Sequence, residues 1–122
     1  SSDVCSSDLD KFFDDISKKI SSKTKVLFLS HITSPTGLVF PLKEIVDFAR
    51  QKQVLTIVDG AHAPGHIDLN LSKIGCDFYT GALHKWMCGP KGTSFLFVKK
   101  EDNIIRYSHF GARLNCRVIY LY

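Results

Sequence analysis

Residues 54–65 read Val-Leu-Thr-Ile-Val-Asp-Gly-Ala-His-Ala-Pro-Gly. The first five are apolar or β-branched without interruption, which is typical of a strand buried in a sheet. Gly60, Pro64 and Gly65 then predict a loop. A carboxylate placed directly after such a strand is partly shielded from water and needs a cationic or N–H partner. The stretch therefore predicts a buried strand that ends at a reactive edge, with Asp59 at its end.

The segments on either side of this strand alternate between helical and strand patterns. Strands are expected at 25–30, 76–80 and 94–98, helices at 10–21 and from Pro41 onward, and at most a short helix at 69–74. The strand at 25–30 is expected to be buried on both faces, and Asp10 is expected to cap the first helix. This alternation predicts an α/β fold with a mostly parallel sheet flanked by helices.

Polar residues follow the predicted strands where the fold would place a ligand. In parallel α/β sheets, ligands bind outside the carboxyl ends of the strands. Here those ends carry residues 31–36, 59–62 and 80–85. We therefore expect these three segments to lie along one edge of the sheet and to form the functional site.

Three residues at this edge each allow a functional and a structural interpretation. Asp59 is either a ligand-binding carboxylate or a turn former, and His62 is either a ligand contact or a loop histidine bonded to backbone. Lys85 stands among apolar neighbours, in the order Leu-His-Lys-Trp-Met. Poor solvation there favours a neutral amine able to form a Schiff base, whereas a structural lysine would extend over the same neighbours into water. Spacing alone leaves these alternatives open.

Composition excludes several classes of protein. The chain has 122 residues with 16 Lys+Arg against 12 Asp+Glu, and this mild excess without a basic block argues against a nucleic-acid partner. No apolar run is long enough to span a membrane. Four cysteines without a CxxC pair support neither a disulfide framework nor a zinc ribbon, and a cytoplasmic location is the simplest setting. Pro64 and Gly65 separate His62 from His66, so no metal site is expected.

The two ends of the chain differ in character from its middle. Residues 1–9 resemble the translation of a common sequencing adapter, and we expect them to be an artefactual or disordered lead-in without chemistry. Residues 10–122 are expected to be part of one domain. The closing run at 117–122 is apolar and β-prone, which fits either an interrupted strand or foreign sequence.

Four motifs in fixed order carry a family resemblance: VDGAHAPG at 58–65, DFYTG at 77–81, HKW at 84–86 and GPKG at 89–92. Together they resemble the class V aminotransferase-fold enzymes, which are fold-type I pyridoxal phosphate (PLP) enzymes. The likeness is to the isopenicillin N epimerase-like branch in particular, with cysteine desulfurases more distant. It covers roughly residues 25–100, the middle of the large PLP-binding domain. Residues 107–111 only loosely resemble the family's next loop.

The resemblance implies a role for five residues. Lys85 would be the catalytic residue that forms the Schiff base with PLP, and Asp59 would pair with the pyridinium nitrogen. His62 stands where desulfurases carry a Gln beside the phenolic oxygen of the cofactor. His84 matches a phosphate contact. Ser34 stands where desulfurases use an Asn near the phenolic oxygen, so it completes the cofactor-binding set.

The resemblance also implies a reaction class. The substrate would be an amino acid, and the chemistry would take place at its Cα, as in epimerases and aminotransferases. Ala82 replaces a Ser that binds phosphate in desulfurases, and Cys88 follows the lysine too closely to match their mobile cysteine. A cysteine desulfurase or lyase of the same family, and a non-catalytic α/β remnant, remain alternatives.

The resemblance has consequences for the parent protein as well. The family builds its active site at a homodimer interface. Its phosphate loop would lie upstream of this chain, and its substrate-binding arginine would lie downstream. The fragment is therefore expected to be inactive alone.

Overall fold

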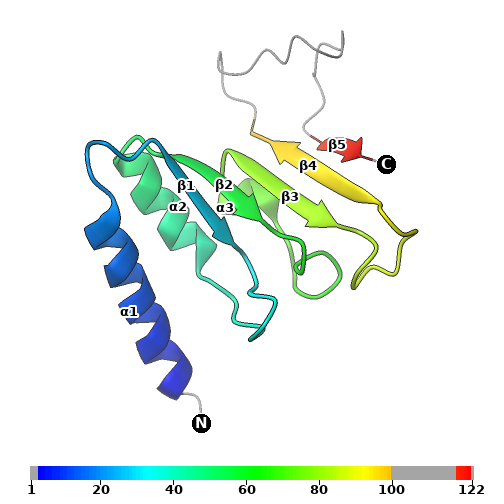
Figure 1. Cartoon of the computed structure of the whole chain (residues 1–122), viewed down its shortest axis with the longest axis horizontal. Coiled ribbons are helices and arrows are strands. Elements are labelled where there is room, and N and C mark those ends of the chain that lie inside the picture. The colour runs from blue at the N-terminus through cyan, green and yellow to red at the C-terminus, as the bar shows by residue number, and fades with distance from the viewer. Residues whose placement is uncertain (1–2, 100–117, 122) are drawn as a thin grey trace, which may run out of the picture.

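The computed structural model describes residues 3–99 and 118–121, which form a five-stranded sheet with helices against it (Figure 1). The elements are α1 (Asp3–Lys19), β1 (Val26–Ser30), α2 (Leu42–Gln51), β2 (Leu55–Asp59), α3 (Leu71–Ile74), β3 (Phe78–Ala82), β4 (Ser94–Val98) and β5 (Val118–Leu121). Their order confirms the predicted α/β class.

The sheet keeps the strands in chain order, from β1 to β5. β1, β2 and β3 are parallel, whereas β4 and β5 each pair antiparallel with the strand before them. The sequence predicted the parallel part but not the reversal at β4. The reversal follows from the connection, because residues 83–93 contain no helix and a parallel return needs a longer crossover, usually a helical one.

The core lies between the sheet and α2, which Figure 1 shows on the same side of the sheet as α3. The apolar stripe of α2 is buried as its helical spacing predicts: Leu42, Ile45, Val46 and Ala49. From the sheet, Leu29, Val58 and Tyr79 join the same cluster. Burial of this stripe fixes α2 over the parallel strands and directs the loop that precedes α2 toward their carboxyl ends.

The expectation that β1 is buried on both faces is wrong. Leu29 is only 7% exposed, but Val26 is 49% exposed and Phe28 is 67% exposed. β1 is the edge strand of the sheet, and within the described residues helices cover only the face that carries Leu29. Its apolar side chains therefore divide between the core and an open face.

Helix α1 begins at Asp3 rather than Asp10, so Asp10 lies inside the helix and does not cap it. The predicted apolar face is confirmed, because Phe12 stacks on Phe40 with ring centroids 4.2 Å apart and Phe13 meets Phe48 edge-on at 5.6 Å. The origin of residues 1–9 stays a prediction. The loop at 107–111 lies outside the described residues.

Strand β3 begins at Phe78, two residues later than predicted. Asp77 explains the shift, because its Oδ2 accepts hydrogen bonds from the backbone N–H of Thr56 (2.8 Å) and from the Thr56 hydroxyl (2.7 Å). The Thr56 hydroxyl also lies 3.0 Å from the Asp77 backbone nitrogen, as acceptor. On the side of β2, these bonds take the place of backbone pairing at the residue before β3.

Candidate functional site

The carboxyl ends of the three parallel strands lie side by side. Asp59, the last residue of β2, is in register with Ser30 at the end of β1 and with Thr80 in β3. The segments that follow these strands, 31–41, 60–70 and 83–93, therefore leave the same edge. The prediction that the polar segments share one edge is confirmed.

The loops after β2 and β3 bring His62 and Lys85 together. Lys85 Nζ lies 3.1 Å from His62 Nε2, and the Trp86 indole N–H donates to His62 Nδ1 at 3.4 Å. The expected desolvation of Lys85 is not observed, because its side chain is exposed. Its neighbours Trp86 and Met87 are themselves 53% and 55% exposed, so within the described residues they do not cover the amine.

The loop that carries Lys85 is closed by backbone hydrogen bonds and packs against the loop that carries His62. Leu83 N–H donates to Thr93 O at 2.9 Å, and Gly89 N–H donates to Leu83 O at 2.8 Å. Gly65 has φ +78, and a Cβ there would lie 2.8 Å from Met87 Cγ and 3.0 Å from the Met87 nitrogen. Only glycine suits this close approach, which sets the distance between the two loops.

Asp59 acts as the turn former that one of its two interpretations predicts, and its role toward a ligand stays a prediction. Its Oδ1 accepts a hydrogen bond from Ala61 N–H at 3.0 Å, which shapes the turn after β2. Its carboxylate is half-buried, and Oδ2 has no hydrogen bond from any residue that the structure describes. One oxygen holds the loop, and the other is available to a ligand.

A buried pair beneath Asp59 was not singled out from the sequence. His31 Nδ1 lies 2.7 Å from the Tyr79 hydroxyl, and His31 N–H donates to the backbone oxygen of Asp59 at 2.8 Å. Burial lowers the pKa of His31. Burial also raises the pKa of Tyr79, and the charges of Cys76 and Asp59 raise it further. The pair is thus neutral and supports the backbone that carries Asp59.

The two other predicted cofactor-binding residues, His84 and Ser34, are not hydrogen-bonded to His62 or Lys85. His84 is exposed, and its Nδ1 lies 3.1 Å from Thr93 O. Ser34 is exposed in the loop after β1, between Thr33 and Thr36, whose hydroxyls are hydrogen-bonded to each other.

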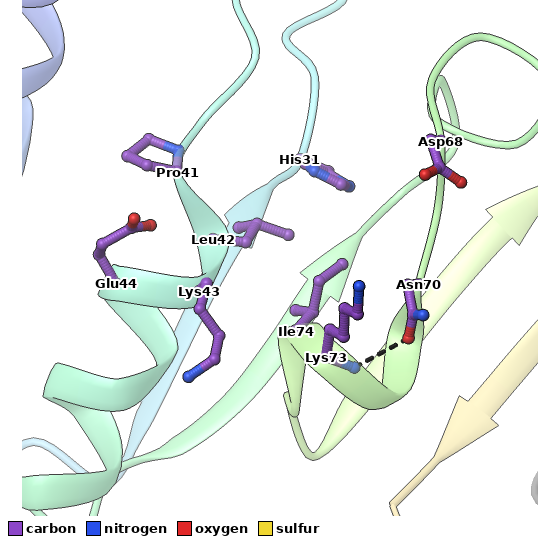
Figure 2. A pocket seen from close by; sticks show the side chains of 9 residues that line it. All are labelled: His31, Pro41, Leu42, Lys43, Glu44, Asp68, Asn70, Lys73 and Ile74. Carbon is purple, nitrogen blue, oxygen red and sulfur yellow. Dashed lines mark hydrogen bonds between the residues drawn. The ribbon is translucent and has the colours of Figure 1, made fainter.

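A separate pocket of about 330 Å³ lies between the start of α2 and α3 (Figure 2). It is lined by polar and apolar residues: His31, Pro41, Leu42, Lys43, Glu44, Asp68, Asn70, Lys73 and Ile74. Asn70 Oδ1 is already used there, because it accepts from Lys73 N–H at 3.0 Å. Asp59, His62 and Lys85 do not line this pocket, so it is distinct from the site at the strand ends.

Metal and membrane features can be assessed for the described part of the chain. Across residues 3–99 and 118–121, no group of three His, Cys, Asp or Glu side chains could hold a metal ion. No helix in that part has the length and apolar content needed to cross a membrane.

Comparison with known proteins identifies relatives of this chain. It is 51% identical over 74 residues to isopenicillin N epimerase of Streptomyces clavuligerus, covering 61% of this chain and 19% of the relative. It is 46% identical over 85 residues to the Amycolatopsis lactamdurans enzyme of the same name, covering 69% and 21%. The chain thus spans about a fifth of the length of these curated relatives.

Solved structures share the fold. A complex of the cystine C-S lyase C-DES with cysteine persulfide superposes with a TM-score of 0.69 at 33% identity, covering 72% of this chain and 24% of that one. The cysteine desulfurase CsdA of Escherichia coli gives a TM-score of 0.66 at 26% identity, with coverage of 71% and 22%. A mutant of C-DES, similar to this chain with a TM-score of 0.68, holds glycine covalently linked to its PLP cofactor. These structures support the cofactor that the resemblance implies.

The family assignment rests on a match along most of the chain. The family model described as Aminotransferase class-V matches residues 7–117, a wider span than the 25–100 expected from the motifs. The epimerase relatives and the more distant desulfurase confirm the resemblance that the motifs predicted. The chain belongs to the class V aminotransferase family.

Proposed function

We propose that the chain forms the central part of the PLP-binding domain of an enzyme that acts at the Cα of an amino acid. The observation that carries the proposal is the 3.1 Å approach of Lys85 Nζ to His62 Nε2, at the edge where Asp59 ends β2. An amine, an imidazole and a half-buried carboxylate at one sheet edge suit a cofactor that carries an aldehyde and a basic ring nitrogen.

The residues present fit that cofactor. When bound, PLP supplies an aldehyde that links covalently to an amine and a ring that withdraws electrons from the substrate Cα. The exposed amine of Lys85 is accessible to such an aldehyde. Asp59 Oδ2 is available to accept from a protonated ring nitrogen, while Oδ1 stays on Ala61 N–H and keeps the carboxylate oriented.

Each of these side chains then has a defined task. Lys85 attaches the cofactor and moves a proton to or from the substrate Cα. His62, whose Nε2 lies 3.1 Å from Lys85 Nζ, orients the amine and would contact the phenolic oxygen of the cofactor. His84, whose Nδ1 lies 3.1 Å from Thr93 O, would contact the phosphate of the cofactor. Ser34, exposed in the loop after β1, would offer its hydroxyl to the phenolic oxygen.

The epimerase-like or aminotransferase-like branch is the better supported reaction class. Identity is 51% and 46% with the two isopenicillin N epimerases, against 36–39% with four curated cysteine desulfhydrases and desulfurases. Cys88 lies in the same closed loop as Lys85, where it cannot swing in from a distance as a mobile sulfur acceptor would. A desulfurase or lyase activity is the second candidate, favoured by the fold shared with C-DES.

We further propose that the full-length protein is a cytoplasmic homodimer whose isolated 122-residue segment is inactive. The exposure of Lys85, Trp86 and Met87 supports this, because an active site of this kind excludes water and needs further protein to cover it. The free thiols of Cys76 and Cys88 agree with a reducing compartment.

Covalent capture of the cofactor tests the proposal. Full-length protein is incubated with PLP, reduced with borohydride and digested, and the modified lysine is located by mass spectrometry. We expect the label on Lys85, its loss in Lys85→Arg, and its retention in Lys91→Arg, which changes an exposed lysine of the same loop. A folded protein that shows no label, or a label that persists in Lys85→Arg, would contradict the proposal and favour a non-catalytic remnant.

A further inference from the structure

The contact between Trp86 and His62 restricts the protonation of the histidine ring. An indole nitrogen can only donate a hydrogen bond. Trp86 Nε1 lies 3.4 Å from His62 Nδ1 and donates to it, so Nδ1 must be the unprotonated nitrogen of the ring. A neutral imidazole then carries its proton on Nε2.

This tautomer determines how His62 meets Lys85. Nε2 lies 3.1 Å from Lys85 Nζ, and in this tautomer Nε2–H is the donor. Only a neutral amine has a lone pair that can accept this hydrogen bond, because an ammonium group has three donors and no acceptor. The neutral amine is also the form that attacks a carbonyl.

Trp86 is itself held in place by the loop after β2. Its ring stacks on His66 with centroids 4.5 Å apart and planes 29° apart. His66 Nδ1 lies 3.2 Å from the backbone oxygen of His62, which ties the stacking partner to the same loop. A Cβ on Gly65 would be 3.0 Å from the Trp86 carbonyl carbon, so the backbones of the two loops are in contact.

We propose that Trp86 is a positioning residue, whose indole N–H holds His62 in the Nε2–H tautomer so that the ring can donate to the neutral amine of Lys85, the form that attacks an aldehyde. The effect on the reaction of Lys85 rests on the proposed function, whereas the contacts of His62 with Trp86 and Lys85 do not. Trp86 touches neither the aldehyde nor the substrate in this scheme. It acts only through His62.

The tautomer can be observed without any cofactor. Full-length protein labelled with ¹⁵N-histidine is studied by two-bond ¹H–¹⁵N NMR at a pH where imidazoles are neutral, and His62 is assigned by comparison with His62→Gln. We expect Nε2 to carry the proton in the wild type and a mixture of tautomers in Trp86→Phe, which keeps a ring against His66. Met87→Leu, a change at the next position that removes no N–H, keeps the wild-type pattern.

The chemical consequence is measured as the rate of covalent capture. In that step Lys85 Nζ forms a C=N bond with the aldehyde carbon of PLP, and its two protons leave with the aldehyde oxygen as water; borohydride then reduces the C=N bond. We expect Trp86→Phe to slow capture on Lys85 by about fivefold, as for the loss of one neutral hydrogen bond, and Met87→Leu to leave it unchanged.

The outcomes separate the two proposals. A proton on Nδ1 in the wild type, or an unchanged His62 pattern in Trp86→Phe, overturns the role of Trp86 even if Lys85 is labelled. Absence of label on wild-type Lys85 overturns the proposed function even if the tautomer is as expected. If Trp86→Phe fails to fold, the indole N–H resonance of Trp86 is compared between the wild type and His62→Gln. This resonance must shift in His62→Gln if the hydrogen bond exists, and an unchanged resonance overturns the role of Trp86.

Discussion

The backbone of Gly60 lies directly against the phenol ring of Tyr79. A Cβ at position 60 would overlap the ring carbons Cε1 and Cζ and the hydroxyl oxygen. Gly60 N–H also donates to Thr80 O at 2.8 Å, which holds the turn to β3. Because Asp59 immediately precedes Gly60, the position of the carboxylate depends on this close packing.

Gly60→Ala should therefore destabilise the protein by about 3 kcal/mol, the upper part of the range for overpacking in a buried site. The measurement is the free energy of unfolding from a urea titration. Gly37→Ala is the control, since Gly37 has φ +65 but a Cβ added there would meet nothing within 4 Å, and it should cost about 1 kcal/mol from backbone strain alone. Equal losses in the two variants would contradict the steric explanation.

Stability should fall as the pH drops below about 6.5 because of His31. Burial lowers the pKa of His31 from its ordinary 6.5, so below that pH the unfolded chain binds a proton that the folded chain does not. Stability is lost as the pH falls from 6.5 toward the folded-state pKa and then levels off. The urea midpoint of unfolding should change less with pH in His31→Asn than in the wild type. His66→Asn, which changes an exposed histidine, should keep the wild-type slope.

Asp59→Asn should weaken PLP binding while leaving the fold nearly unchanged. An amide oxygen can still accept from Ala61 N–H, but the charge that pairs with a protonated ring nitrogen is lost. Affinity measured by absorbance titration should drop roughly 10- to 100-fold, the usual effect of one charge-assisted hydrogen bond. Asp47→Asn, at a surface ion pair with Lys43, should bind PLP normally. Unchanged affinity in Asp59→Asn would refute the assigned role.

Cys76 and Cys88 should differ in reactivity. Cys88 is exposed, whereas Cys76 is buried, and burial raises the pKa of Cys76 to about 12. Because the thiolate is the reactive species, native protein treated with iodoacetamide should label Cys88 at least about 100-fold faster. Peptide mass spectrometry over a time course measures both rates, with urea-unfolded protein as the reference. Comparable labelling in the native state would contradict the burial of Cys76.

Much of the parallel core could be predicted from the sequence, because its signals are local. The apolar spacing of α2 fixes which of its residues are buried, and strand runs such as 54–58 are short and continuous. The shared edge follows from a general property of parallel sheets, so His62 and Lys85 could be expected near one another. The family motifs then supplied roles that spacing alone left open.

What could not be predicted depends on partners distant in the chain. Phe28 belongs to a run that reads as fully buried, but a sequence pattern does not tell whether both faces of a strand are covered. His31 and Tyr79 are 48 positions apart, and nothing in the sequence around either residue indicates that the two are in contact. The exposure of Lys85 likewise depends on what surrounds its loop, which apolar neighbours in sequence do not determine.

The register of β2 sets a limit on how this sequence can change. Asp59 is paired with Ser30 on one side and Thr80 on the other, while Val58, one position earlier, is fully buried in the core. Side chains alternate between faces along a strand, so an insertion or deletion of one residue within 55–59 would exchange the places of Val58 and Asp59. Such a change would bury a carboxylate and expose a core valine at once. Changes of length are therefore not tolerated in β2, whose residue count fixes where the reactive edge begins.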